Sequence, residues 1–177
     1  MSYDINLIDP VSKEIATVPG HLMIGGTYKA DYDLETYTFT PALNTDAGLN
    51  ITYNYGRYYR EVFDDGIRHI YGMSGAESIP VLNEMINKIR EKYMIDGQWI
   101  VTQRERQIYF DKFGKQIINP FACMRSDNQY TSTVIVVDVS EEPNDDYWVA
   151  TAGNAIKPLY QLIALATMRP DCIWDGD

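Results

Sequence analysis

The sequence contains only two cysteines and two histidines in 177 residues, which limits the chemistry that it can carry. Cys123 and Cys172 lie far apart and form no CxxC pair, a usage typical of a reduced, cytosolic protein. Nucleophilic catalysis would need His21 or His69 beside a Ser or Cys, together with a third orienting group. Ser74 lies in Gly-Met-Ser-Gly rather than in the GxSxG of a nucleophile elbow, so no catalytic residue is predicted.

Basic residues are also few: the chain has 15 Lys and Arg and 25 Asp and Glu, which gives a net charge of −10. Each contact with a nucleic-acid phosphate needs a Lys or Arg, so direct binding to nucleic acid is not expected. An acidic chain is compatible with ordinary solubility, or with binding to a basic partner surface, including mimicry of nucleic acid.

Long apolar segments are missing from the sequence. The longest apolar run near the C-terminus, Leu162 to Ala166, is far too short to span a membrane. The N-terminal residues MSYDINLIDP contain no basic segment followed by an apolar one, as a signal peptide would. We therefore expect a soluble, cytoplasmic protein with no membrane partner.

Recognisable patterns for metal or phosphate binding are missing as well. Gly25-Gly26 lacks the following Lys-Ser/Thr of a phosphate loop, and Asp31 to Thr40 lacks a calcium loop that ends in Glu. Mg²⁺-dependent chemistry needs converging carboxylates, and those available have no diagnostic spacing: Asp64, Asp65, Glu77, Asp138, Asp145 and Asp146. No cofactor and no metal are predicted, and a metal-dependent nuclease stays open as an alternative function.

Apolar residues are abundant enough for a core, at 45% of the chain with 14 Tyr, 5 Phe and 3 Trp. The length predicts a single domain, residues 1–177. The pattern of strand-like and helix-like segments predicts an α+β fold, in which a mixed or antiparallel sheet is packed by two main helices. These helices are Ser78–Tyr93 and about Tyr147–Met168, and residues 97–140 between them are β-rich.

Hydrophobic periodicity and end signals support both helices. Ser78 is the expected N-cap of the first helix, and Glu84 and Lys88 form a favourable i,i+4 pair. In the second helix, Pro158 predicts a kink or a restart with Asn154 as the cap. The expected apolar stripes are Ile79, Leu82, Met85, Ile86, Ile89 and Tyr93, and then Ala155, Ile156, Leu159, Leu162, Ile163 and Ala166.

Strands are expected where apolar residues alternate or β-branched residues gather. Tyr3–Asp9 and Lys13–Val18 would form an N-terminal hairpin, and Thr131–Val139 is apolar enough for a central strand. Trp174, which lies between acidic residues in the tail, is expected to fold back and become buried. The other expected strands are Asp31–Thr40, Leu49–Tyr55, Ile67–Tyr71, Trp99–Thr102, Gln107–Phe110 and Lys115–Ile118.

The stretch Leu49–Ile79 concentrates the residue types most typical of a binding surface. Tyr and Arg bring large contact areas with polar tips, and free N–H groups at the start of the following helix would favour an anion. The predicted contact residues are Tyr53, Tyr55, Arg57, Tyr58, Tyr59, Arg60, Arg68, Ser74 and Glu77. The alternative is that the alternating tyrosines simply pack under the sheet.

Four segments resemble a family of small proteins from phages and mobile elements of Gram-positive bacteria. They are MSYDINLIDP at the start, LNITYNY at 49–55, IRHIYGMSGAESIPVL at 67–82, and DDYW…TAGNA…MRPDCIWDGD at the end. In similar proteins the central helix leads more directly to the DDYW segment, which implies that residues 97–140 are an insertion. The resemblance carries no catalytic residue across to this chain.

Small acidic proteins of mobile elements commonly inhibit host defence, and some streptococcal anti-CRISPR proteins against Cas9 are similar in size and character. The resemblance therefore implies a host-defence inhibitor that binds Cas9, or its complex with guide RNA, in the host cytoplasm. Its acidic surface would engage a Lys/Arg-rich nucleic-acid channel. The alternative is a protein that binds a small molecule or nucleotide with the tyrosine-rich strand and the glycine-flanked helix start.

Overall fold

A computed structural model describes residues 2–20, 30–41, 43–117 and 130–177. The chain forms two compact units, one made of residues 1–99 and 142–177 and the other of residues 100–141. Helices and antiparallel sheets are both present, so the predicted α+β class is confirmed. The expected turn at Gly25-Gly26 lies outside the described residues, as does His21.

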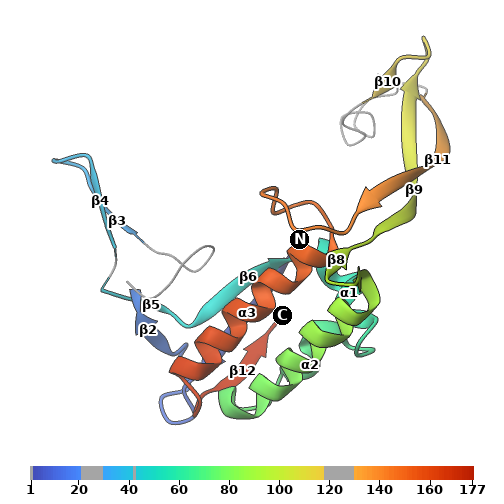
Figure 1. The fold of residues 1–177 in the computed structure, drawn as a ribbon. Helices are drawn as coiled ribbons and strands as arrows, with labels where there is room; N and C mark the ends of the chain where they lie inside the picture. Colours follow the sequence, from blue (N-terminus) through green and yellow to red (C-terminus); the bar gives the residue numbers. More distant parts are fainter. Residues whose placement is uncertain (1, 21–29, 42, 118–129) are drawn as a thin grey trace. The chain divides into compact units, whose positions relative to one another are not determined.

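The first unit contains a three-stranded antiparallel sheet in the order β12-β1-β6 (Figure 1). Its register places Ile5 opposite Leu49 and Leu7 opposite Trp174. These four side chains are buried, so the two-residue period directs one face of the sheet into the core and the predicted burial of Trp174 is confirmed. The strands are β1 (Ser2–Ile8), β6 (Gly48–Thr52) and β12 (Ile173–Gly176).

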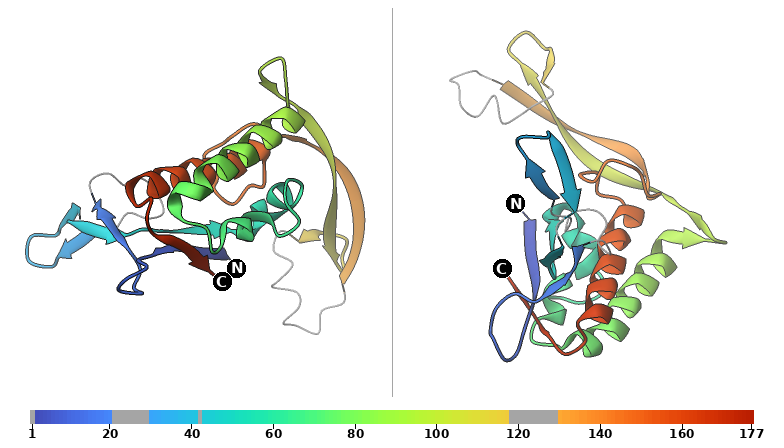
Figure 2. Two further views of the ribbon diagram at one scale, coloured as in Figure 1. Left: turned by 90° about the horizontal axis from the view of Figure 1, so that it is seen from below. Right: turned by 90° about the vertical axis from the view of Figure 1, so that its left-hand side faces the viewer.

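Two long helices, α2 (Gly75–Tyr93) and α3 (Ala152–Met168), lie side by side against this sheet (Figure 1 and Figure 2). The predicted stripes form their buried faces, although Ile79 and Ile163 are partly exposed. The predicted pair on α2 is confirmed, because the Lys88 ammonium lies 2.7 Å from the Glu84 carboxylate.

The start of α2 differs from the prediction by one helical turn. Ser74 is the N-cap: its hydroxyl accepts from the Glu77 N–H, and the Glu77 carboxylate accepts from the Ser74 N–H at 2.8 Å. This capping box completes the helix start four residues before the predicted cap, so the assignment of Ser78 is wrong. Ser78 is instead buried inside the helix, where its hydroxyl donates to the Gly75 carbonyl.

The start of α3 also differs, because the helix begins at Ala152 and not at Tyr147. The N-cap is Thr151, whose hydroxyl accepts from the Asn154 N–H at 3.1 Å, so Asn154 is not the cap. Pro158 lies within one continuous helix, so the alternative of a restart is wrong. The acidic residues before Tyr147 form turns with their own side chains, which Asn and Asp favour over helix.

The segment that follows β6 forms short helices instead of continuing as a strand. The Thr52 hydroxyl accepts from the Asn54 N–H and starts η2 (Tyr53–Tyr55), so the strand predicted to Tyr55 ends at Thr52. η3 (Gly66–Ile70) replaces the predicted strand Ile67–Tyr71, and α1 (Gly56–Arg60) lies between the two. Alternation over so few residues does not distinguish a short strand from a helical turn.

The first unit also contains three two-stranded antiparallel sheets, of which β3-β4 and β7-β8 are hairpins. The segment predicted as one strand over Asp31–Thr40 is a hairpin, and the Asp33 carboxylate accepts from the N–H groups of Glu35 and Thr36 in its turn. The expected N-terminal hairpin reduces to a single bridge between Ile8 and Ile15. The strand pairs are β2 (Thr17–Pro19) with β5 (Asn44–Asp46), β3 (Ala30–Asp33) with β4 (Thr38–Pro41), and β7 (Met94–Ile95) with β8 (Gln98–Trp99).

The second unit is an antiparallel ribbon in the order β10-β9-β11. The Asp111 carboxylate accepts from the N–H groups of Phe113 and Lys115 and closes the predicted turn after β9. β11 is an edge strand, so its prediction as a central strand is wrong. The strands are β9 (Val101–Asp111), β10 (Gln116–Ile117) and β11 (Tyr130–Ser140).

Across the described ranges of both units, no helix combines the length and apolar character needed to cross a membrane.

Candidate functional site

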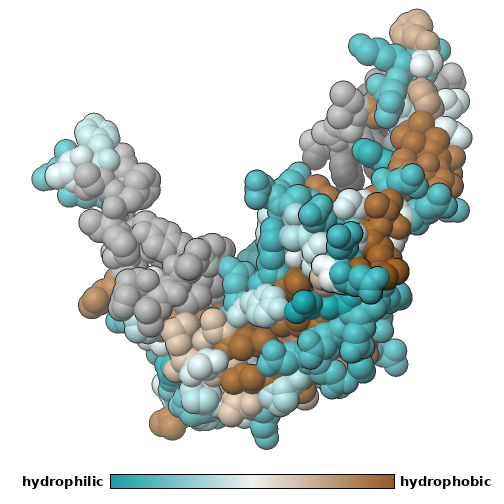
Figure 3. Space-filling view, viewed as in Figure 1, coloured by the Kyte–Doolittle hydropathy of each residue, from teal (hydrophilic) through white to brown (hydrophobic). Residues whose placement is uncertain are grey.

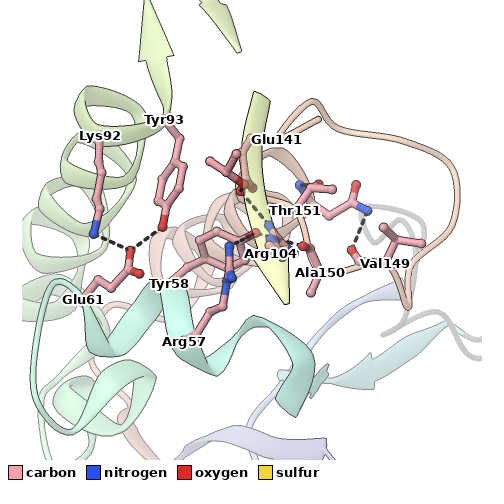
Figure 4. A network of polar contacts seen from close by, with 12 residues as sticks. Arg57, Tyr58, Glu61, Lys92, Tyr93, Arg104, Glu141, Val149, Ala150 and Thr151 are labelled. Carbon is pink, nitrogen blue, oxygen red and sulfur yellow. Dashed lines mark hydrogen bonds and ion pairs between the residues drawn. The ribbon is translucent and has the colours of Figure 1, made fainter. Parts of the chain in front are cut away.

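Three tyrosines of the predicted contact group are buried and bond to backbone carbonyls of the loop 142–151 and of α3. The Tyr58 hydroxyl donates to the Ala150 carbonyl of the loop at 2.9 Å (Figure 4). The Tyr59 hydroxyl donates to the Ala155 carbonyl of α3 at 2.8 Å. The Tyr55 hydroxyl donates to the Tyr147 carbonyl. All three side chains are at most 1% exposed, so they connect the first unit internally and offer no area to a partner.

The remaining Tyr and Arg members of the group make local contacts at or near the surface. Tyr53 packs edge-on against Tyr3, with 4.3 Å between ring centroids. The Arg68 guanidinium lies over the Tyr3 ring, 5.3 Å from its centroid. Arg57 lies over the Tyr58 ring and donates to its hydroxyl at 3.0 Å (Figure 4). Of the tyrosines and arginines in the group, Arg60 and Arg68 are exposed.

The glycine-flanked helix start is closed by the chain itself. The Gly75 N–H donates to the Cys172 carbonyl at 2.8 Å, and the Ala76 N–H donates to the Pro170 carbonyl at 3.0 Å. The hydrogen bonds from Ser74 also lower the pKa of Glu77, which places a carboxylate at this helix start. The expected free N–H groups are therefore occupied, and Ser74 and Glu77 serve as the helix cap and not as an anion site.

A cleft of about 670 Å³ lies elsewhere in the first unit, between β6, the loop 142–151 and the first turns of α3. Aromatic and aliphatic groups form most of its wall, and the side chains of Trp148 and Tyr160 are exposed there. The lining residues are Leu49, Asn50, Tyr55, Asn144, Asp145, Tyr147, Trp148, Asn154, Lys157, Pro158, Tyr160 and Gln161. A volume and lining of this kind are typical of a binding site.

Asn154 fixes the loop that forms one wall of the cleft. The nitrogen of its buried amide lies 3.0–3.1 Å from three acceptors, the carbonyls of Asp146 and Val149 and the Asn144 side-chain oxygen, which share its two N–H groups. Its carbonyl oxygen accepts from the Asn144 N–H at 3.0 Å. One side chain thus contacts four polar groups of the loop, which orders the backbone that carries Trp148.

Tyr147 connects the same loop to the sheet. Its hydroxyl donates to the Asn50 carbonyl at 2.9 Å and accepts from the Thr52 N–H at 2.8 Å, so it pairs with the outer edge of β6. Its ring lies edge-on to Tyr55 and to Trp148, with centroid distances of 5.7 Å and 5.4 Å. Trp148 therefore stands on an ordered aromatic base while 63% of its surface stays exposed.

The charged groups beside the cleft are mostly acidic. Asp145 lines it, and Glu142 and Asp146 belong to the same loop. Lys157 is the basic residue of the lining, and its ammonium donates to the Asn144 carbonyl at 2.6 Å. The cleft thus combines an apolar aromatic wall with an acidic rim, an arrangement that suits an apolar group carried by a basic surface.

His69 accepts or donates a hydrogen bond with Asp65 and stacks on Phe63, at 4.0 Å between ring centroids. Among the described residues, no three His, Cys, Asp or Glu side chains gather in a way that could hold a metal ion. The arrangement at the cleft is suited to non-covalent binding.

The residues that line the cleft were not among the predicted contact residues, apart from Tyr55. The predicted helix Tyr147–Met168 includes Tyr147 and Trp148, whereas in the structure both residues lie in the loop before α3. The signal that could have found them is the run Asn144-Asp145-Asp146 directly before two aromatic residues, because Asn and Asp favour turns over helix interiors. Trp and Tyr in such a turn are typical of binding hot spots.

No family model, curated protein or solved structure matches this chain.

Alkaline pH is expected to destabilise the first unit, because burial raises the pKa of Tyr55, Tyr59 and Tyr147. In the unfolded chain these groups ionise near pH 10, so full stability is present below about pH 10 and is lost as the pH rises further. Urea unfolding curves at rising pH measure this loss. Tyr55→Phe should weaken this pH dependence of stability, whereas Tyr37→Phe, at an exposed position, should leave it unchanged. Equal pH dependence in both variants would contradict the role given to the buried tyrosines.

Proposed function

We propose that the protein acts by binding a partner protein non-covalently, and that it holds an apolar side chain of that partner in the aromatic cleft. The observation that carries this proposal is Trp148, which is 63% exposed on a loop that Asn154 and Tyr147 hold in place. Exposing an indole on an ordered loop is unfavourable in water unless a partner covers it, and ordered Trp and Tyr side chains dominate binding energy at interfaces.

The rim favours a protein partner with a basic surface over a nucleotide. Phosphate recognition uses free backbone N–H groups and several basic side chains, whereas the charged residues that line this cleft are Asp145 and Lys157. The charge of the whole chain agrees with this choice. Residues 1–99 and 142–177 contain twenty acidic and ten basic residues, and residues 100–141 contain five of each, so the first unit carries the entire net charge.

The partner class that the acidic unit and the family resemblance favour is a nucleic-acid-binding defence protein of a bacterial host, in particular Cas9 or its complex with guide RNA. Such a protein has a Lys/Arg-rich channel for its nucleic acid, and an acidic protein competes for it by electrostatic attraction. The activity proposed for this chain is therefore inhibition of host defence by occupation of that surface, in the host cytoplasm.

Direct binding measurements with purified Cas9, alone and loaded with guide RNA, test the partner. We expect binding that weakens as the salt concentration rises, together with inhibition of target cleavage. Absence of binding to either form would remove Cas9 as the partner, and binding without inhibition would remove the inhibitory function.

Trp148→Ala tests the cleft. We expect affinity for the partner to fall by about thirtyfold or more, the effect of losing a hot-spot side chain, while the melting temperature stays close to that of the parent protein. Phe113→Ala is the matched control, because Phe113 is an exposed aromatic residue in the turn of the second unit. Equal affinities for the two variants would place the binding surface outside the cleft.

The aromatic wall also favours a second candidate, a small apolar or aromatic ligand, because 670 Å³ lies within the usual range for such sites. A thermal-shift screen against small molecules, nucleotides included, tests it, since a ligand of the folded state raises the melting temperature. A true ligand of the cleft would lose its shift in Trp148→Ala.

A further inference from the structure

The outer edge of β11 is long and lacks the features that protect strand edges. β11 pairs with β9 over all eleven of its residues, Tyr130–Ser140, and no strand that the structure describes pairs with its other side. Val134, Ile135 and Val136 in its centre are exposed, and hydrophobic residues gather along this ribbon (brown in Figure 3). An edge of this kind is a template for pairing with another strand.

The neighbouring strand β9 pairs with β10 only at Tyr109 and Phe110, and no other described strand pairs with that side of it. β9 carries Arg104, Glu105 and Arg106 in succession, and charged side chains are a common means of preventing strand addition. From Tyr130 to Val137, β11 contains no charged residue and no proline, and six of these eight residues are Thr, Val or Ile. The two long strands of the ribbon are therefore composed differently, and β11 is the one open to addition.

The charge distribution indicates which strand would add to β11. Residues 100–141 are neutral, with five acidic and five basic residues, although the chain as a whole carries −10. A ribbon without net charge adds no repulsion of its own when it meets the same ribbon of a second copy. A basic partner, by contrast, gains nothing from a neutral strand.

We propose that β11 pairs with β11 of a second copy of this chain, antiparallel and related by a two-fold axis. A pairing centred on Ile135 uses the whole strand, because each residue then lies opposite another residue of β11 on the same face of the sheet. It places Val134 opposite Val136 and Asp138 opposite Ser132. The two Asp138 carboxylates do not face each other, so the register brings no like charges into direct opposition.

This inference is independent of the function proposed for the cleft, since the two surfaces belong to different units. It predicts a dimer that assembles through main-chain hydrogen bonds and apolar side chains. Its formation should therefore depend on protein concentration and only weakly on salt, whereas association through surface charges would respond strongly to salt.

Sedimentation velocity and light scattering on the full chain test the proposal. We expect the mass to rise with concentration from the 20.3 kDa of the monomer to twice that value, and not beyond. Val136→Lys should keep the chain monomeric at concentrations where the parent dimerises. Val101→Lys is the matched control, because Val101 is 63% exposed, Val136 is 62% exposed, and Val101 lies on β9.

Hydrogen exchange supplies a second measurement that does not depend on either variant. Amides on the outer edge of β11 should exchange more slowly as the parent protein is concentrated, while those of β9 should not change. A chain that stays monomeric at every concentration overturns the proposal, as do larger open-ended assemblies. Equal loss of the dimer in both lysine variants also overturns it.

Discussion

Trp174→Ala is expected to lower the free energy of unfolding by about 3–5 kcal/mol, the usual cost of truncating a buried Trp. Trp174 is 1% exposed, and its indole N–H donates to the buried Ser78 hydroxyl at 2.7 Å. Its backbone pairs with Leu7 of β1 on one side and bonds to Gly72 and Met73 on the other. The variant thus leaves a cavity between sheet and helix, and the Ser78 hydroxyl loses the hydrogen bond that it accepts from the indole.

Urea unfolding followed by circular dichroism measures this effect. Because small domains are stable by only about 5–15 kcal/mol, the variant should unfold at much lower urea concentration or be partly unfolded in buffer. Trp148→Ala is the chemically identical control at an exposed position and should change stability by less than about 1 kcal/mol. Trp174→Phe keeps most of the ring and should cost less than the alanine variant; equal losses in all three would show that the indole is not a core element.

Gly153→Ala is expected to destabilise the protein by about 1–3 kcal/mol, although alanine normally favours a helix over glycine. A Cβ at position 153 would lie 2.2 Å from the backbone nitrogen of Pro143 and 2.4 Å from its Cδ. Real atoms do not approach so closely, and a backbone nitrogen cannot rotate away as a side chain does. The loop that begins at Pro143 must therefore move, and it carries Trp148 and the acidic rim.

Hydrogen exchange of the amides in residues 144–151 measures this displacement, and we expect it to become faster in Gly153→Ala. Ala164→Gly is the control, because it weakens the same helix at an exposed position by about 1 kcal/mol without touching the loop. If both variants leave exchange in the loop unchanged, the contact between Gly153 and Pro143 does not hold the cleft wall.

Much of the fold could be predicted because its signals are local. The apolar stripe of α2 and the alternation of β1 each follow from spacing in the sequence, and both hold in the structure. Errors arose where two local signals competed. Ser74 and Ser78 are both acceptable N-caps. The capping box with Glu77 selects Ser74, and the Ser78 hydroxyl instead accepts a hydrogen bond from the Trp174 indole.

The candidate site could be predicted only in part, because its construction is non-local. Tyr55, Tyr58 and Tyr59 were identified as important, and they do carry specific hydrogen bonds. Their roles differ from the expected one, since a tyrosine buried with a satisfied hydroxyl and one exposed at an interface have the same signature in a sequence. Accessibility is a property of the packed chain.

The sequence by itself determined the α+β class, the core faces of the long helices and the acidic net charge. Only the tertiary structure decided that Tyr55 and Tyr58 bond to a loop more than ninety residues further along the chain, on which Trp148 is exposed beside a cleft. It likewise decided that β11 is an edge and not a centre. The physical reason is that periodicity reports which face of an element avoids water, whereas the identity of the neighbour depends on contacts between distant residues.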